Sequence, residues 1–204
     1  MYHFNGIPVE VVDPASPIRV SDTVCPILVC LLGEFRVLTK VGQSVRLNSS
    51  KAGVLLYYLG LQYQQSIPRD VLLETVWPGH APELASHSLN SLTYSLRKLL
   101  GDDIGGDAPV LHEAGYYRLN REAGVGVDVA YFESLVKAGD QQVVANNLPT
   151  AVSFYAQAIQ LYRGDLCAGT DINSVMARER LRAHFLRILS MAFPLASSST
   201  SLSR

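Results

Sequence analysis

The spacing of leucines predicts a helix over residues 86–101, which read SHSLNSLTYSLRKLLG. Leu89, Leu92, Leu96 and Leu99/Leu100 recur at the three-and-four spacing of a buried stripe. The opposite face carries His87, Asn90, Ser91, Tyr94, Arg97 and Lys98, and the stretch contains no acidic residue. Such a face suits a position beside a polyanion such as DNA, and it equally fits a solvated amphipathic helix.

The remaining apolar pattern of the first half predicts strands, then helices, then a hairpin. Three short antiparallel strands are expected near residues 27–31, 34–39 and 44–47. The pattern becomes helical from Ser49 or Ser50, a second helix has Pro68 near its first turn, and a third begins at Pro82 and ends near Gly101. PVLHEAGYYRLN then predicts a hairpin that turns at Ala114–Gly115.

From Val127 onward the pattern is helical throughout. One amphipathic helix has Asp128 as a candidate cap, another covers residues 148–163 and stops at Gly164, and an arginine-rich one covers residues 172–192. Small and large residues alternate in the middle helix as in a tetratricopeptide-type hairpin: Ala151, Phe154, Tyr155, Ala158, Ile159 and Tyr162.

Three pieces of the first half resemble the OmpR-type winged helix. They are Leu72-Leu73 to Trp77-Pro78, LTYSLRKLLG in the third helix, and Gly115-Tyr116-Tyr117-Arg118-Leu119. The resemblance implies an α+β winged helix with a leading antiparallel sheet, three helices and a C-terminal wing hairpin.

The second half resembles the bacterial transcriptional activator domain. The resemblance rests on Leu161-Tyr162-Arg163-Gly164-Asp165-Leu166 followed by the arginine-rich helix. Both halves in this order are similar to the SARP class of bacterial activators, and the resemblance covers about residues 27–192. Two departures stand out: Ile172-Asn173-Ser174-Val175 replaces the tryptophan that commonly opens the last helix, and the domain stops after about three helices. We therefore expect a truncated or frame-disrupted product.

Four segments follow from these patterns. We expect an extended lead-in over residues 1–24 and a winged helix over residues 25–121. A partial, all-α and tetratricopeptide-like activator domain is expected over residues 127–192, followed by a disordered tail over residues 193–204, whose serine-rich end cannot build a core.

Composition narrows the class of protein. The net charge is −1, and residues 25–121 hold nine Lys/Arg against eight Asp/Glu, so only the placement of the charges favours DNA. Three cysteines (Cys25, Cys30 and Cys167) lack metal-ligand spacing, so we expect no metal or other cofactor, and reduced thiols fit a cytoplasmic protein. The sequence also lacks a secretory signal and any apolar run long enough for a membrane span.

The third helix is the candidate reader of the DNA major groove, because that groove admits a helix. Asn90 could pair with adenine, and Arg97 with guanine or a phosphate. His87, Ser91, Tyr94 and Lys98 follow one line along the same face.

Phosphate anchors are expected at two other places. Lys51, beside Ser49 and Ser50, and Arg69 stand at the starts of helices one and two, where free N–H groups favour anions; a plain cap beside a solvated cation fits as well. In the hairpin, Arg118 and Tyr117 could reach the DNA, while Tyr116 is expected to pack inward. Trp77 is expected in the core.

The sequence contains no signature of an enzyme. No H-E-x-x-H, G-x-S-x-G or G-x-x-x-x-G-K-[ST] pattern occurs, and the chain is too short to add a phospho-acceptor receiver domain.

We expect a sequence-specific regulator that binds double-stranded DNA, and the resemblance implies that it is an activator. RNA polymerase is expected as a further partner, and a homodimer is expected on direct repeats. Arg178, Arg180, Arg182 and Arg187 fit a solvated surface or a second DNA or polymerase contact. The alternative function is a tetratricopeptide-like protein-interaction module whose winged helix is only a scaffold.

Overall fold

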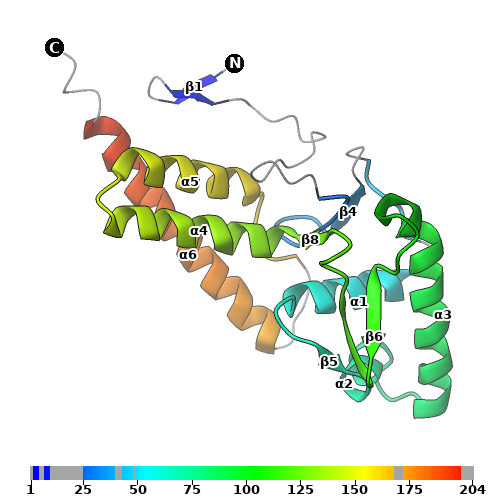
Figure 1. Ribbon diagram of the computed structural model, residues 1–204. Helices are drawn as coiled ribbons and strands as arrows, with labels where there is room; N and C mark the ends of the chain where they lie inside the picture. The colour runs from blue at the N-terminus through cyan, green and yellow to red at the C-terminus, as the bar shows by residue number, and fades with distance from the viewer. Residues whose placement is uncertain are drawn as a thin grey trace. The chain divides into compact units, whose positions relative to one another are not determined.

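The computed structural model describes residues 2–4, 7–9, 25–39, 43–47, 49–167 and 172–198, with side chains from residue 25 to residue 192 within these ranges, apart from residue 172. The chain divides into two compact units. The mixed unit comprises Pro17–Leu31 and Phe35–Val129, and the helical unit comprises Met1–Ser16, Leu32–Glu34 and Ala130–Arg204. Each unit can be followed by colour in Figure 1.

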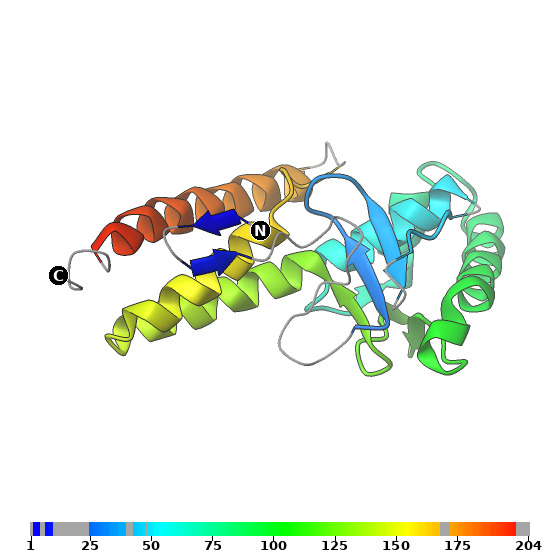
Figure 2. The ribbon, with the colours of Figure 1, turned by 90° about the horizontal axis from the view of Figure 1, so that it is seen from above.

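The first sheet of the mixed unit has the strand order β4-β3-β8. Strand β3 (Ile27–Cys30) pairs antiparallel with β4 (Arg36–Thr39) and parallel with β8 (Val125–Val127). All four residues of β3 are buried, as expected for a central strand with both faces covered. Figure 2 shows β3 and β4 side by side.

The third strand expected over residues 44–47 is wrong. Ser44 forms only an isolated bridge with Leu38, and residues 45–47 contain no strand. The third strand of this sheet is β8, which pairs with the other edge of β3 and buries Val125 and Val127. Ser44 and Arg46 are exposed, so a longer strand along the outer edge of β4 would bury little apolar surface.

Three helices follow in the mixed unit, and they lie close to the sequence expectation. Helix α1 (Ser50–Leu61) is capped by Ser49, whose hydroxyl accepts a hydrogen bond from the Lys51 N–H. Helix α2 (Arg69–Val76) has Pro68 as its N-cap, and α3 (Pro82–Leu100) starts with proline at its first position. A short 3-10 turn, η1 (Gly101–Ile104), ends at Gly105, whose φ of 72° suits a residue without a side chain.

A second sheet, with the strand order β5-β7-β6, follows the helices. Strands β6 (Val110–Glu113) and β7 (Tyr116–Leu119) form the expected hairpin, whose tight turn places Ala114 and Gly115 at positive φ. The two-residue strand β5 (Ile67–Pro68), just before α2, pairs with β7 and was not anticipated. It ties the hairpin to the start of α2.

The helical unit contains the three helices expected from the sequence: α4 (Asp128–Val144, whose first two residues group with the mixed unit), α5 (Leu148–Leu161) and α6 (Ile172–Ser198). Its core includes Phe132, Ala151, Tyr155, Leu181 and Ile188, all nearly inaccessible to solvent. Helix α6 extends to Ser198, so residues 193–198 of the expected disordered tail are helical; the rest of that tail lies outside the described residues.

The expected lead-in, residues 1–24, lies outside the described residues except for β1 (Tyr2–Phe4) and β2 (Ile7–Val9), which pair antiparallel. Small sheets with three helices, followed by a mostly helical unit, are compatible with a winged helix followed by a helical domain. No helix in the described part of the chain is long and apolar enough to cross a membrane.

Candidate nucleic-acid interface

Helix α3 buries most of the leucine stripe that the sequence predicts, and Leu92 and Leu99 of that stripe are half-buried. Leu89, Leu96 and Leu100 are at most 1% exposed, and Ala85 completes the inward-facing row. This row packs toward α1 and α2, and the buried residues of α2 include Leu72 and Val76. The leucines therefore fix the rotation of α3 about its axis and so decide which side chains face solvent.

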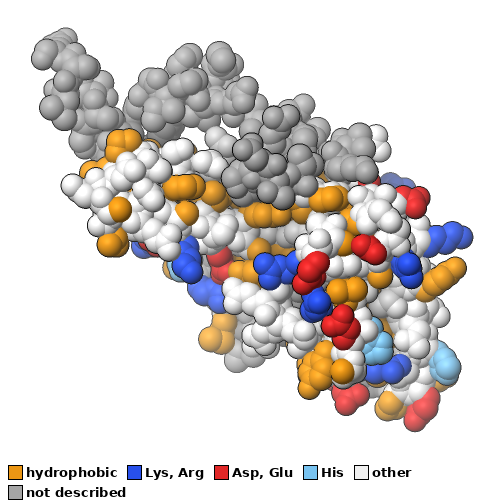
Figure 3. Space-filling view, viewed as in Figure 1, with side chains coloured by type: hydrophobic (Ala, Val, Ile, Leu, Met, Phe, Trp, Pro, Cys, Tyr) orange, Lys and Arg blue, Asp and Glu red, His pale blue; other side chains and the backbone are white. Residues whose placement is uncertain are grey.

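The outward face holds five of the predicted site residues, all exposed: His87, Asn90, Ser91, Tyr94 and Lys98. Tyr94 is 69% exposed, the highest value for any large apolar or aromatic side chain on α3. Within the described ranges these five side chains make no hydrogen bond or ion pair. In Figure 3, the edge that α3 occupies in Figure 1 carries basic, hydrophobic and histidine side chains, with acidic groups toward its ends.

Arg97 is exposed as well, but its guanidinium already has a partner. Its Nε and Nη2 donate to the carbonyl of Gly106 at 3.3 and 3.1 Å. The side chain thereby fastens the loop after η1 to the C-terminal turn of α3. Lys98 is consequently the cation of α3 whose ammonium group has no partner among the described residues.

The two predicted anchors at the starts of helices differ from each other. The Nζ of Lys51 donates to the carbonyl of Val76, the last residue of α2, at 2.5 Å, so this lysine satisfies a free carbonyl at a helix end. Arg69, in contrast, is half-buried, and its Nε is buried without a hydrogen-bond partner in the described structure. Trp77, expected in the core, is only half-buried and caps the C-terminus of α2.

In the hairpin the expected orientation of the two tyrosines is wrong. Tyr117 is 1% exposed and stacks on His112 with ring centroids 4.2 Å apart, whereas Tyr116 is 49% exposed. Strand residues alternate between faces, so the burial of Leu119 requires Tyr117 to face inward and places Tyr116 and Arg118 on the outer face. Burial raises the pKa of Tyr117, and nearby Arg69 partly offsets this.

Arg118 is held by two carboxylates on that outer face. Its Nη1 binds both oxygens of Glu122, at 3.0 and 2.8 Å, and its Nη2 lies 4.0 Å from Glu113. The hydrogen bond to Glu122 raises the pKa of Arg118 and lowers that of Glu122. The cation that the sequence assigns to DNA is therefore paired within the protein.

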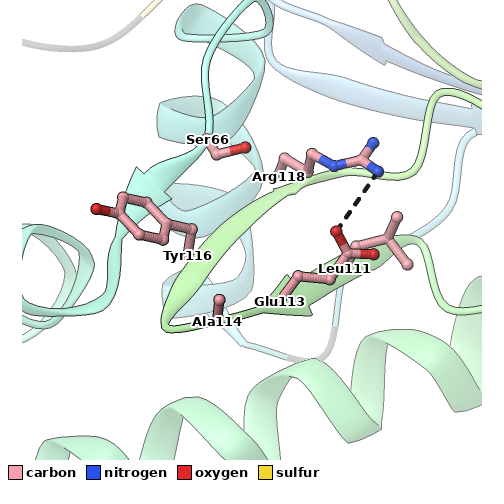
Figure 4. A pocket seen from close by; sticks show the side chains of 6 residues that line it. All are labelled: Ser66, Leu111, Glu113, Ala114, Tyr116 and Arg118. Atoms are coloured by element: carbon pink, nitrogen blue, oxygen red, sulfur yellow. Dashed lines mark ion pairs between the residues drawn. The ribbon is translucent and has the colours of Figure 1, made fainter.

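A shallow hollow of about 260 Å³ lies beside this ion pair. Figure 4 shows Arg118 and Glu113 reaching toward each other from the neighbouring strands β7 and β6. Ser66, Leu111, Ala114 and Tyr116 form the rest of its lining. The hollow is open and holds a neutralised ion pair, so it offers little electrostatic attraction of its own.

The arginines of α6 serve mostly as internal contacts of the helical unit. Arg187 binds both oxygens of Asp140 at 2.9 Å, and Arg180 pairs with Glu133 at 2.9 Å. The Nε of Arg178 donates to the carbonyl of Leu166. These contacts join α6 to α4 and to the segment before α6, so Arg178, Arg180 and Arg187 have internal partners that neither sequence alternative included.

The comparisons with known proteins bear on the fold and on the class of protein. Residues 127–200 match the bacterial transcriptional activator domain family. Over these residues the chain is similar to that family. This domain belongs to transcriptional regulators rather than to an enzyme class, so the match supports a regulator of the transcription-activator type.

A solved structure extends the likeness beyond the activator domain. The chain is similar to Mycobacterium tuberculosis EmbR, solved in complex with a low affinity phosphopeptide, with a TM-score of 0.58 and 19% identity. The similarity covers 83% of this chain but 43% of that one, so this chain spans less than half of the EmbR chain. No curated protein matches the sequence. The resemblance to a SARP-type bacterial transcriptional regulator is confirmed.

Proposed function

We propose that this protein is a sequence-specific DNA-binding transcriptional regulator whose mixed unit is an OmpR-type winged helix. Helix α3 docks in the major groove, with Asn90, Tyr94 and their neighbours toward base edges and Lys98 toward phosphate. The observation that carries the proposal is the exposed outward face of α3. Between Leu84 and Leu100 that helix has no acidic residue, and its polar side chains are fixed outward by the buried leucines.

The supporting contacts come from the other elements of the mixed unit. Arg69 at the start of α2 has an unpartnered Nε beside helix N–H groups that attract anions. The hairpin β6–β7 is the wing, and its Arg118 binds a DNA phosphate once it is released from Glu113 and Glu122. Lys51 contributes to the helix packing and is a weaker candidate for a phosphate, because its ammonium group binds Val76.

The helical unit supplies the regulatory part of the proposal. It is a tetratricopeptide-like activator domain that mediates homodimerisation on direct repeats or contacts RNA polymerase. A cytoplasmic location goes with this role, since bacterial DNA lies in the cytoplasm.

Selection from a random duplex pool tests the function directly. The full chain is expected to enrich a defined sequence, and two half-sites in direct repeat would support a dimer. An unenriched pool, with weak binding that is the same for every duplex, would favour the rival protein-interaction function instead. Exposed apolar side chains on α6, Met176 and Leu186, are then the place to look for a partner.

Removing the cations at the end of α3 is expected to weaken DNA binding and to reduce its salt dependence. The double substitution Arg97→Ala with Lys98→Ala is expected to lower the slope of log affinity against log salt by roughly 0.9 for each phosphate that the protein no longer neutralises. Fluorescence anisotropy of a labelled duplex at several salt concentrations measures the slope. Lys137→Ala, which removes an exposed lysine from α4, is the matched control and is expected to leave the slope unchanged. Equal slopes for the double variant and the control would contradict the docking of α3.

Releasing Arg118 is expected to have the opposite effect. Glu122 holds the guanidinium at 2.8 Å, so it competes with a DNA phosphate for the same cation. Glu122→Gln is therefore expected to raise duplex affinity a few-fold and to steepen the salt dependence, within the small range of exposed ion pairs. The carboxylate of Glu113 lies 4.0 Å from Nη2 of Arg118, so Glu113→Gln is expected to raise the affinity less than Glu122→Gln does. An unchanged affinity in Glu122→Gln would remove Arg118 from the proposed interface.

A further inference from the structure

The first turn of α3 exposes a large apolar side chain that the DNA-binding residues above do not include. Leu84 is 68% exposed, nearly as much as Tyr94. Every other leucine of α3 is buried or half-buried. Leaving this much apolar surface in water has a cost, and the leucine stripe of the core does not require it.

Helical geometry places Leu84 on the outward face. At about 100° per residue, Leu84 lies roughly 130° from the mean direction of Ala85, Leu89, Leu96 and Leu100. Ser91 and Tyr94 lie about 150° from that direction by the same measure. Leu84 is thus an N-terminal continuation of the row that contains His87, Ser91 and Tyr94.

Local helix stability does not account for an exposed leucine at this position. A hydrophobic staple joins the residue before the N-cap to the residue at the fourth helical position. Here the N-cap is Ala81, so those positions hold His80 and Ala85 rather than Leu84. The hydroxyl of Ser88 donates to the backbone carbonyl of Leu84, and this bond does not involve the leucine side chain.

The charge beside Leu84 points to a base rather than to the backbone. Glu83 precedes it in the exposed first turn, and a carboxylate repels a phosphate. In the major groove only thymine presents a methyl group, and apolar side chains contact it. The N-terminal residues of a recognition helix are also the ones that reach base edges.

We infer that Leu84 contacts the 5-methyl group of a thymine and that the DNA site carries a thymine beneath the first turn of α3. This inference rests on the proposed function, because it assumes that α3 docks in the major groove. It makes Leu84 a specificity-determining residue. Arg97, which the sequence assigned to base reading, is held by Gly106 at the other end of the helix.

Replacing thymine by deoxyuridine tests the contact without changing the base pairing. In the duplex obtained from the pool selection, each thymine is replaced singly, and binding of the full chain is measured by anisotropy. Deoxyuridine at one of these positions is expected to lower the affinity of the wild-type chain about fourfold, which corresponds to roughly 0.8 kcal/mol for one buried methyl group. Leu84→Ala is expected to bind the thymine and deoxyuridine duplexes equally, whereas Leu84→Met keeps an apolar contact and retains the difference.

One control variant and two distinct outcomes separate this inference from the proposed function. Val144→Ala shortens an apolar side chain that is 89% exposed on α4 and is expected to retain the full difference at that thymine. The thymine contact alone is overturned if the chain binds its selected duplex but no deoxyuridine substitution lowers the affinity. It is also overturned if a deoxyuridine lowers the affinity of Leu84→Ala as much as that of the wild type. A chain that selects no duplex overturns the proposed function and this inference together.

Discussion

Gly139→Ala is expected to lower the free energy of unfolding of the helical unit by about 1–2 kcal/mol, although alanine is the better helix former. A Cβ at this position of α4 would collide with Cε1 of Tyr155 and would lie 2.7 Å from Cδ1 of the same ring. Overpacking of this kind costs about 1–3 kcal/mol, and the helix propensity of alanine offsets at most about 1 kcal/mol of that.

The Tyr155 ring cannot move aside cheaply. It is fully buried, and its hydroxyl donates to Asp140 Oδ1 at 2.6 Å. Burial and this hydrogen bond raise the pKa of Tyr155 to about 12, so the hydroxyl remains a donor at neutral pH. Burial acts to raise the pKa of Asp140, but its hydrogen bonds from Arg187 and Tyr155 outweigh that and lower it. A displaced ring would therefore break a network that joins all three helices.

Hydrogen exchange read peptide by peptide over α4, α5 and α6 measures the destabilisation in Gly139→Ala. Gly53→Ala is the matched control, because its Cβ would lie 3.4 Å from Phe35, an ordinary contact, in the interior of α1. That variant is expected to be neutral or up to about 1 kcal/mol more stable. Equal protection in Gly139→Ala and the parent would show that the ring relaxes freely, contrary to this expectation.

Asp128→Ala is expected to destabilise the mixed unit by about 2–3 kcal/mol. Asp128 is 3% exposed, and both of its carboxylate oxygens lie 2.8 Å from the N–H of Leu31, the residue that follows β3. Leu31 is itself fully buried, so removal of the carboxylate leaves an N–H without a partner where water cannot replace it. The substitution also removes the acceptor for the Val129 N–H at the start of α4.

Urea unfolding followed by the fluorescence of Trp77, the single tryptophan of the chain, reports this destabilisation in the mixed unit. Asp128→Asn keeps one oxygen that can accept from Leu31, so it is expected to cost clearly less than the alanine variant. The interpretation fails if both variants unfold at the same urea concentration, or if neither differs from the parent.

The sequence predicted the elements that have local signals. The three helices of the mixed unit, the hairpin at Ala114–Gly115 and the three later helices follow from apolar periodicity and from Ser, Pro and Gly at their ends. Periodicity also identified the outward face of α3, because a helix with one apolar stripe has one orientation against a core. The Asp128 position was marked as a helix start, whereas its bond to Leu31, 97 residues away in sequence, has no local signal.

Tertiary structure decided strand pairing and the partners of the cations. Strand β3 takes β8, which is distant in sequence, as its second neighbour, while Ser44 forms only an isolated bridge to β4, and a single sequence does not contain that information. The sequence does not distinguish the three basic residues Lys51, Arg97 and Arg118. In the fold, the carbonyl of Val76 binds Lys51, the carbonyl of Gly106 binds Arg97, and two carboxylates lie beside Arg118. Apolar patterns therefore determined which side of each helix or strand is buried and which side faces solvent, because burial acts on each residue along the element. Only the packed chain determined which charges remain available, because a charge is paired by groups distant in sequence.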